Sequence, residues 1–376
     1  MSHLDYLALR KKLLFSICLL LIVSLMAYGL TIAYRAPSLY AYAKGHSRGW
    51  FRPVFRSDPE LGWVPIPGTR SAHTFPIGPD IPMQFDADGF RVPVGEQGTN
   101  RSRPLILAIG CSFTYGDACL AEDTFPHKVA QSLGGTELNA GVCSYGLAQM
   151  MLLAERLIPR YSPDYVLIQY SPWLFDRATM HFAPTYFSYA FNPFFADTPA
   201  GGVEICPPAF SNYDIDLSPW RASPRGPLDF ASFLMRRALP LFVHNDVGIL
   251  SYRIQRALGL IKQPTKNRSE VLKIVYGRIQ ALCSQNKSRP LIVILGDSSA
   301  GISIPKELGE LEMPLVNASA VLIAALPEST ADAYHRAYGH FRGSPPVCVD
   351  GHPNPRAHTM IAKTIVDYIH AMGRTP

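Results

Sequence analysis

The feature that most restricts how this chain can fold is an apolar segment near its N-terminus. The segment from Leu13 to Tyr34 contains no Asp, Glu, Lys or Arg. As a helix, its roughly 22 residues extend about 33 Å, enough to cross the hydrocarbon core of a bilayer. We therefore expect residues 13–34 to form a transmembrane helix after a short tail, residues 1–12.

Basic residues on either side of this segment indicate its orientation. Arg10, Lys11 and Lys12 directly precede it. Arg35 and Lys44 follow it more sparsely. Because clustered positive charge stays in the cytoplasm, the tail is expected inside the cell and the bulk of the chain outside it. In a bacterial cell this describes a single-pass inner-membrane protein with a periplasmic domain.

Two other roles for the apolar segment remain open. A cleaved signal peptide usually has an apolar core of about 7–15 residues, which is shorter than this one, and small residues at its cleavage site. Ala41-Tyr42-Ala43 resembles such a site only weakly. The third alternative is a helix buried in the core of a soluble protein.

The composition argues against two classes of function. The formal net charge is +6, but the basic residues are scattered and form no dense stripe with interleaved aromatic residues. Nucleic-acid binding is therefore not expected. The seven cysteines contain no CxxC pair, so a zinc site is not expected either. We expect no metal ion or organic cofactor.

From Pro104 onward, short apolar runs alternate with helical patterns. The expected strands are 105–109, 136–140, 165–170, 291–295 and a fifth that begins near 315, and the expected helices are 124–133, 147–158, 266–285 and 356–371. Such alternation is typical of a parallel sheet with right-handed crossovers. The sequence therefore predicts an α/β domain over residues 104–372.

Two stretches lie between the apolar segment and this domain. Residues 35–60 are expected to form a juxtamembrane connector. Residues 61–103 are expected to form a small β-hairpin subdomain, because Asp88-Gly89 between apolar stretches signals a tight turn.

The α/β pattern is interrupted over residues 171–265, which are rich in Pro, Phe and Tyr. Only about 228–240 and 246–260 have helical patterns. The insertion follows the third strand, at the carboxyl edge where open α/β sheets bind ligands. It is expected to be a lid or a substrate-facing cap, and the alternative is a structural elaboration that packs on the hairpin subdomain.

The first candidate for chemistry is Ser112, in the stretch from Gly110 to Gly116 that directly follows the first strand. A serine at a strand-to-helix corner can expose its hydroxyl at the edge of the sheet, beside a backbone N–H that is free to bind an oxyanion. The simpler alternative is that this serine only caps a helix.

The second candidate is the stretch from Asp350 to Asn354, which precedes the last helix. A serine nucleophile needs a base, and the base needs an acceptor that fixes its tautomer. His352 and Asp350 can supply both, although Asp350 or Asn354 could instead cap the helix. His358 is the competing base, but it is expected inside the helix.

Together these stretches resemble the SGNH/GDSL hydrolases. In that family the first strand ends in Gly-Asp-Ser-Phe-Thr-x-Gly, and Glu-x-Thr-Phe-Pro follows. This chain has Cys111 in place of the aspartate, and then Glu122 to Pro126. Asn139-Ala140-Gly141 is similar to the second block and His352-Pro353-Asn354 to the last one. Asp350, two residues before the histidine, resembles the alginate O-acetyltransferase branch.

The resemblance implies a flavodoxin-like, three-layer sandwich with about five parallel strands. It implies Ser112 as nucleophile, His352 as base and Asp350 as its partner, with the N–H groups of Ser112 and Gly141 in the oxyanion hole. The implied activity is that of a serine esterase, an O-acyl hydrolase or an acyltransferase. The substrate is then an acyl ester on an envelope glycan or lipid.

One departure from the family pattern leaves an alternative open. The third block should provide Gly-x-Asn-Asp after the third strand, but this chain has Tyr170-Ser171-Pro172-Trp173. Ser171 or the Trp173 indole could replace the missing donor, although local packing is their simpler role. The alternative is a catalytically weak or inactive relative that binds glycans or assists envelope assembly.

Two further features have simple explanations. Gly296-Asp297-Ser298 follows the fourth strand, lacks the Phe-Thr-x-Gly continuation and is a common turn sequence, so Ser298 is not expected to be the nucleophile. Cys111 and Cys143 flank the candidate site. Buried free thiols are the simplest expectation for them, and a disulfide stays open outside the cytoplasm.

Overall fold

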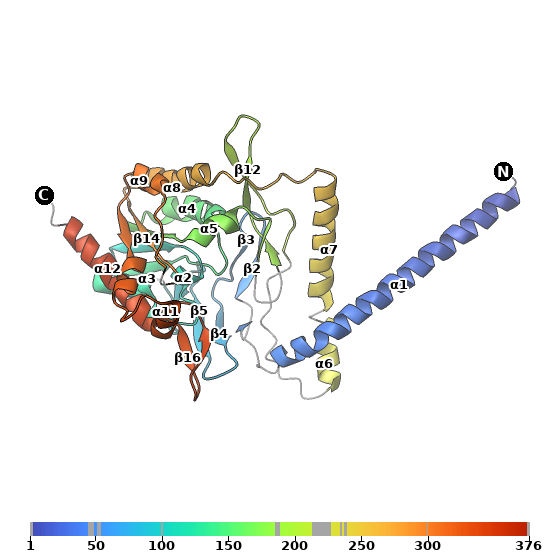
Figure 1. Cartoon of the computed structure of the whole chain (residues 1–376), viewed down its shortest axis with the longest axis horizontal. Coiled ribbons are helices and arrows are strands. Elements are labelled where there is room, and N and C mark those ends of the chain that lie inside the picture. The colour runs from blue at the N-terminus through green and yellow to red at the C-terminus, as the bar shows by residue number, and fades with distance from the viewer. Residues whose placement is uncertain are drawn as a thin grey trace.

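The computed structural model describes residues 3–43, 49–50, 54–98, 101–184, 189–212, 227–233, 235–236, 239–298 and 300–373. Its centre is a sheet with five parallel strands (Figure 1). These strands are β8 (Thr136–Asn139), β7 (Leu105–Ile109), β9 (Tyr165–Tyr170), β14 (Arg289–Ile294) and β15 (Leu315–Asn317), in spatial order. In chain order this is 2-1-3-4-5, the flavodoxin-like arrangement. The expected fold class is therefore confirmed.

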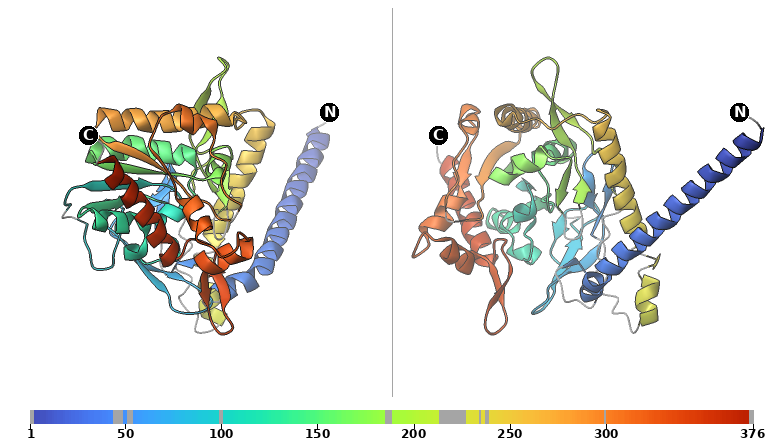
Figure 2. Two further views of the ribbon diagram at one scale, coloured as in Figure 1. Left: turned by 60° about the vertical axis from the view of Figure 1, so that its left-hand side comes forward. Right: turned by 45° about the vertical axis from the view of Figure 1, so that its right-hand side comes forward.

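Helices cover both faces of the parallel sheet, which makes three layers (Figure 2). One face carries α4 (Leu147–Tyr161) and α8 (Arg268–Gln285). The other carries α3 (Phe125–Ser132), α10 (Ala318–Ala324) and α12 (Pro355–Met372). Every residue of β7 is buried, which explains why this strand is a continuous apolar run and not an alternating one.

The sheet continues beyond β8 with antiparallel strands from the segment that was expected to form a small β-hairpin subdomain. The added strands are β6 (Arg91–Val92), β5 (Ile81–Phe85), β4 (Arg70–Thr74) and β1 (Gly49–Trp50). Arg91 pairs with Asn139, so β6 covers the edge that β8 would otherwise expose. Gly89, with φ of +87°, lies in the turn between β5 and β6, as the Asp88-Gly89 signal indicated.

A separate hairpin of β2 (Phe55–Asp58) and β3 (Gly62–Pro65) packs on the loop that follows β8. The Trp63 indole donates to the Cys143 carbonyl at 3.2 Å, and its ring lies edge-on to that of Tyr145. Gln149 on α4 donates to the Leu61 carbonyl at 2.9 Å. These contacts fix a loop that lies beside the candidate site.

The insertion after β9 contains more strand than its sequence indicated. Its elements are α5 (Pro172–Ala178), β10 (Phe182–Pro184), β11 (Tyr189–Phe191), β12 (Phe194–Asp197), β13 (Val203–Cys206), α6 (Pro227–Phe233) and α7 (Leu239–Ala257). Asn212 donates to the Gly62 carbonyl at 2.8 Å and to that of Phe191 at 2.7 Å. These bonds join the insertion to the β2–β3 hairpin, which favours the structural elaboration over a lid.

The N-terminal apolar segment lies within a long helix, α1 (His3–Ala43), that projects away from the α/β domain (Figure 1). Its stretch Arg10–Tyr34 contains an 18-residue window with a mean hydropathy of 2.5, and no residue of that window is buried. A helix of this length and composition can cross a membrane, and a signal sequence has the same properties. Its exposure argues against the third alternative, a core helix.

Gly135, between α3 and β8, provides a test of the packing at the start of the sheet. A Cβ at this position would lie 1.9 Å from the Pro104 carbonyl oxygen, which is backbone and cannot move aside easily. We expect Gly135→Ala to lower the free energy of unfolding by about 1–3 kcal/mol, measured by thermal unfolding.

Gly277→Ala on α8 is the matched control, because its Cβ would meet only Leu311 Cδ2 at 3.6 Å. Alanine favours helix over glycine by about 0.5–1 kcal/mol, so this variant should be as stable as the original chain or more so. Equal effects of the two substitutions would contradict the predicted packing.

Candidate active site

Ser112 lies where β7 turns into the short helix α2 (Ser112–Tyr115), and 6% of its surface is exposed. Gly110 makes this corner possible, because a Cβ there would lie 2.1 Å from Thr114 Oγ1 and 2.4 Å from Gln169 Oε1. Gly116 ends the helix with φ of +77°, which favours glycine. Gly110 and Gly116, on either side of Ser112, therefore allow the tight turns that fix where its side chain lies.

Gln169 on β9 holds this corner through both ends of its buried carboxamide. Its oxygen accepts from the Cys111 N–H at 2.9 Å and from Thr114 Oγ1 at 2.8 Å. Its nitrogen donates to Cys111 Sγ at 3.2 Å and to Ser171 Oγ at 2.8 Å. Three of these hydrogen bonds tie the ends of the first and third strands together at the site, and the fourth joins Gln169 to the residue that follows its own strand.

Arg91, from the antiparallel part of the sheet, holds the other end of α2. Its buried guanidinium donates to the carbonyls of Tyr115 at 2.7 Å, Gly116 at 2.6 Å and Cys119. A cation at a helix C-terminus is also favourable for the helix dipole. The segment expected to form a small β-hairpin subdomain therefore helps to position Ser112.

His352 and Asp350 reach Ser112 from the far end of the chain. Asp350 ends β17 (Val347–Asp350), which pairs with β16 (His340–Arg342). His352 Nε2 lies 2.9 Å from Ser112 Oγ, and His352 Nδ1 lies 2.6 Å from Asp350 Oδ1. The same carboxylate oxygen accepts from the His352 N–H at 2.8 Å. The three residues expected to act together are therefore in contact.

The loop that carries His352 is fixed on both sides. Asn354 caps α12 by accepting from the Ala357 N–H at 3.0 Å, and its amide nitrogen donates to the carbonyls of Ala337 and Gly339 at 3.0 Å each. Gly339 follows α11 (Ala331–Tyr338). The role of helix cap thus belongs to Asn354, whereas Asp350 contacts His352.

Sequence reasoning missed a second carboxylate beside the imidazole. Asp117 is 1% exposed, and its Oδ2 lies 4.0 Å from His352 Nε2. Its Oδ1 lies 3.0 Å from Nδ1 of His73, a buried residue on β4. The only hint of Asp117 in the sequence was that an acidic residue directly follows Gly116. Nothing in the sequence indicated that β4 would bring His73 to this place.

Ligand atoms of Asp117, Asp350 and His352 lie within 4.8 Å of one another, close enough to be considered as a cation site. However, the two ring nitrogens of His352 already face Asp350 and Ser112 at hydrogen-bond distance. An imidazole bound on both nitrogens fits the role of a base better than that of a metal ligand.

The two expected oxyanion donors differ in their surroundings. Within the described ranges, the Ser112 N–H has no protein acceptor. The Gly141 N–H, in contrast, donates to Asn139 Oδ1 at 3.1 Å. Gly141 is pressed against α2, since a Cβ there would lie 2.3 Å from the Tyr115 nitrogen. In this conformation Gly141 permits close packing, and its N–H is occupied.

The two residues considered as replacements for the missing asparagine make other contacts within the protein. Ser171 is buried and donates to the Leu295 carbonyl at 2.7 Å. Trp173 lies edge-on to Phe113, with ring centroids 5.1 Å apart. Phe113 in turn lies edge-on to His352 at 5.4 Å. Both residues therefore contribute to local packing.

Cys111 replaces the family's aspartate in an electropositive environment. Burial alone would raise the pKa of its thiol, but Arg177, the Phe113 N–H, the Trp173 indole and Gln169 outweigh burial and lower that pKa. The surroundings of Cys111 thus favour a negative charge, as they would for the aspartate that the SGNH/GDSL hydrolases have at this position. Cys111 and Cys143 are both buried, as expected.

Neither competitor for the catalytic roles lies in the triad. His358 is fully buried in α12, where its Nδ1 accepts from the Phe125 N–H at 3.1 Å. Burial lowers the pKa of His358 to about 3, so this imidazole is neutral near pH 7. Ser298 follows β14, which is separated from β7 by β9 in the sheet.

His358 gives a prediction about stability and pH. Its pKa is about 3 in the folded chain and 6.5 in an unfolded one. Between these values only the unfolded chain takes up a proton, so acidification favours unfolding. We expect the free energy of unfolding to fall by up to about 1.4 kcal/mol per pH unit from this group. Denaturant unfolding at a series of pH values measures the slope.

His358→Asn should flatten that slope, because an amide can still accept from the Phe125 N–H but does not titrate. His370→Asn, at an exposed position on the same helix, is the matched control and should leave the slope unchanged. A steep slope that persists in His358→Asn would contradict the prediction.

The comparisons with known proteins give distant structural matches. No protein-family model and no curated protein matches the chain. A solved structure from Desulfitobacterium hafniense, assigned to the G-D-S-L family of lipolytic proteins, is 10% identical with a TM-score of 0.31, over 71% of this chain and 99% of that one. A two-domain esterase active on acetylated mannans is 13% identical with a TM-score of 0.34, over 71% and 50%.

A third match is a carbohydrate esterase family 2 enzyme with a carbohydrate binding domain, from Corynascus thermopiles (Myceliophthora fergusii). It is 12% identical with a TM-score of 0.36, over 81% of this chain and 73% of that one. At such identities, residue roles cannot be transferred from these structures. The similarity of this chain to the SGNH/GDSL hydrolases rests on the motifs and the strand order of the chain itself, and not on these distant matches.

Proposed function

We propose that the chain is a serine esterase or acyltransferase of the SGNH type, in which Ser112 is the nucleophile, His352 the base and Asp350 its orienting partner. One observation carries the proposal. Ser112 Oγ, His352 Nε2, His352 Nδ1 and Asp350 Oδ1 form a continuous hydrogen-bonded row with contacts of 2.9 and 2.6 Å. Both contacts lie within the range that proton transfer requires.

In the proposed reaction, Ser112 Oγ attacks the acyl carbonyl carbon while its proton passes to His352 Nε2. The Ser112 N–H then binds the oxyanion of the tetrahedral intermediate. Collapse breaks the bond to the leaving alcohol, which takes the proton from Nε2 and leaves an acyl-Ser112 ester. Water or an acceptor hydroxyl, deprotonated by His352, then attacks this ester and regenerates the serine.

We assign Asp117 the role of a positioning and charge-stabilising residue. Its carboxylate is buried and lies 4.0 Å from the nitrogen that receives the serine proton. Opposite charges at this separation attract by about 4 kcal/mol at an effective dielectric constant near 20, before desolvation is counted. Asp117 would therefore favour the imidazolium form that exists during the acyl transfer.

The proposed substrate class is an O-acyl ester of an envelope glycan or lipid. This assignment rests on α1, which is long and apolar enough to hold the domain at a membrane. Hydrolysis and transfer proceed through the same acyl-enzyme, and the identity of the acceptor separates them. Product analysis with and without a glycan acceptor distinguishes the two.

A second candidate function is a weakly active or inactive glycan-binding protein. The observation in its favour is that the Gly141 N–H and the Ser171 hydroxyl are both engaged within the protein. Loss of one oxyanion donor typically costs about 100–1000-fold in rate. Covalent labelling separates the candidates, because it requires an activated serine but no natural substrate.

The reactivity of Ser112 can be measured directly. The original chain should react with a fluorophosphonate probe and hydrolyse an activated acetyl ester. Ser112→Ala should lose the label entirely and lose hydrolysis by at least about 1000-fold. Gel fluorescence and ester kinetics measure the two effects.

Ser298→Ala is the matched control, because it removes the serine of the Gly-Asp-Ser sequence outside the triad. It should retain both labelling and hydrolysis. If the original chain resists the probe under conditions that label a known serine esterase, the glycan-binding candidate replaces the enzyme. Labelling that survives Ser112→Ala would place the nucleophile elsewhere.

The second prediction concerns Asp117. Asp117→Asn removes a negative charge beside His352, so the imidazole should accept a proton less readily. We expect kcat to fall by about 10–100-fold and the acidic limb of the pH–rate profile to move to lower pH. A purely structural role would lower activity without moving that limb. Fluorophosphonate labelling should slow but persist.

A further inference from the structure

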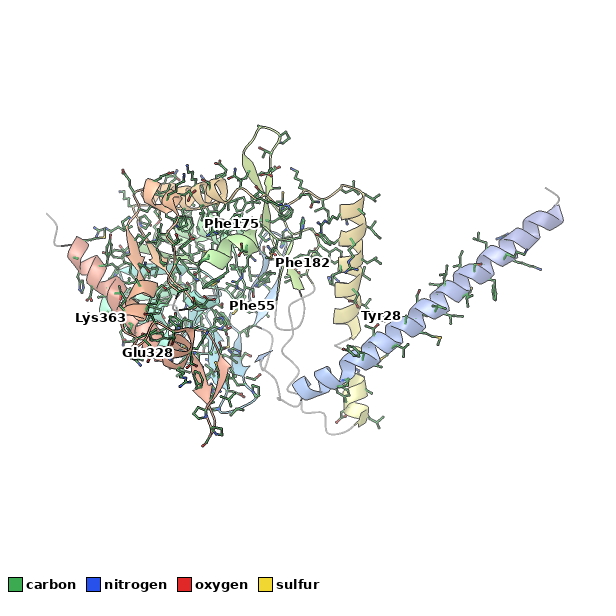
Figure 3. All side chains as sticks on the ribbon, in the orientation of Figure 1. Tyr28, Phe55, Phe175, Phe182, Glu328 and Lys363 are labelled. Atoms are coloured by element: carbon green, nitrogen blue, oxygen red, sulfur yellow. The ribbon has the colours of Figure 1, made fainter. Side chains whose placement is uncertain are left out.

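Helix α7 packs on the rest of the insertion with one face only. Gly248 and Tyr252 lie on that face and are buried. A Cβ at Gly248 would lie 2.7 Å from the Phe210 ring, and the Tyr252 hydroxyl lies 2.9 Å from His181 Nδ1. Phe182, which Figure 3 labels beside α7, lies edge-on to the Tyr252 ring. The inner face of α7 is thus already occupied.

The opposite face of α7 is apolar as well. Val243, Val247, Leu250 and Ile254, called the outer stripe below, follow at steps of four, three and four residues, the spacing of one helix face. Their exposed fractions are 42%, 53%, 58% and 52%. Leu258 and Leu260 continue the apolar character at 67% and 70% exposure.

This pattern is unusual for a helix that faces water. A surface helix normally presents charged or polar residues opposite its buried stripe. Contiguous exposed apolar side chains on a folded domain mark a surface that contacts a partner or a lipid. We therefore expect a partner or a lipid surface to cover the outer stripe.

The position of α1 indicates which occupant this is. In all three views of Figures 1 and 2, the C-terminal part of α1 passes beside the lower end of α7. Figure 3 places Tyr28 of α1 at that point, and Tyr28 is half-buried where most of its neighbours are exposed. Since Arg10–Tyr34 can cross a bilayer, α7 lies close to the level at which α1 leaves it.

The charges around α7 fit a lipid surface. Arg236, Arg253, Arg256 and Lys266 are exposed before, within and after the helix. Among residues 228–268 of the sequence, Asp229 and Asp246 are the acidic residues. Apolar stripes flanked by arginine and lysine bind the interface of bilayers that contain anionic lipids.

We propose that the outer stripe of α7 lies in the headgroup and acyl-chain boundary of the bilayer that α1 spans. The domain would then touch the membrane at two places, one spanning and one interfacial, which fixes its orientation. This inference rests on α1 as a membrane span and is independent of the triad. The alternative occupant, a second copy of the chain, is an outcome of the test.

The test uses the full chain in vesicles of phosphatidylethanolamine and phosphatidylglycerol, with or without brominated acyl chains. Leu250→Trp places a fluorophore in the outer stripe, and Val321→Trp places one at an exposed valine on α10. Quenching is read relative to the original chain, which has four tryptophans. Flotation with the vesicles reports the insertion of α1 separately.

We expect both variants to float, and the added emission of Leu250→Trp alone to be quenched by bromine and shifted to the blue. Equal quenching of the two variants in floating protein would overturn the interfacial role of α7. A dimer in detergent together with that result would assign the outer stripe to a second copy. Failure of the original chain to float would overturn the α1 span and the α7 proposal together.

Discussion

The carboxamide of Gln169 is the interaction on which the candidate site depends most. It joins the corner after β7 to the end of β9, the two neighbouring strands between which the order of the sheet reverses. Ligand sites in open α/β sheets lie at this reversal, because the chain leaves the two strands in opposite directions and opens a crevice. In this chain Ser112 lies at this reversal, and Gln169 ties the loop that carries it to β9.

The environments of three histidines decide which one can act as a base. Burial lowers the pKa of His340 and that of His358, so both are neutral structural residues. His352 is 22% exposed at its side chain and lies between the carboxylates of Asp350 and Asp117. A proton taken up by His352 therefore meets negative charge on both sides, whereas one taken up by His358 would be cut off from water and would face the positive charges of Arg91 and Lys128.

Local patterns were sufficient to predict the parallel half of the sheet. The strands 105–109 and 165–170 match residue for residue, because buried parallel strands are continuous apolar runs. Ser112, His352 and Asp350 could be paired because a serine nucleophile needs a base and the base needs an acceptor, although Asp350 ends a separate hairpin and not a parallel strand. The extension through β6 to β1 could not be predicted, since its pairing depends on contacts distant in sequence. For the same reason, the local sequence did not indicate that His73 would lie beside Asp117. It also gave no sign of the bond between the Gly141 N–H and Asn139.

The entry of β1 into the sheet limits how far the domain can move from α1. The helix ends at Ala43 and β1 begins at Gly49, so the connecting backbone can extend at most about 20 Å. With α1 in a bilayer, the hydroxyl of Ser112 would sweep a shell of space above the lipid headgroups whose height this short connection limits. Acyl chains or polymer strands would have to enter that shell, which makes distance from the membrane itself a criterion of substrate selection.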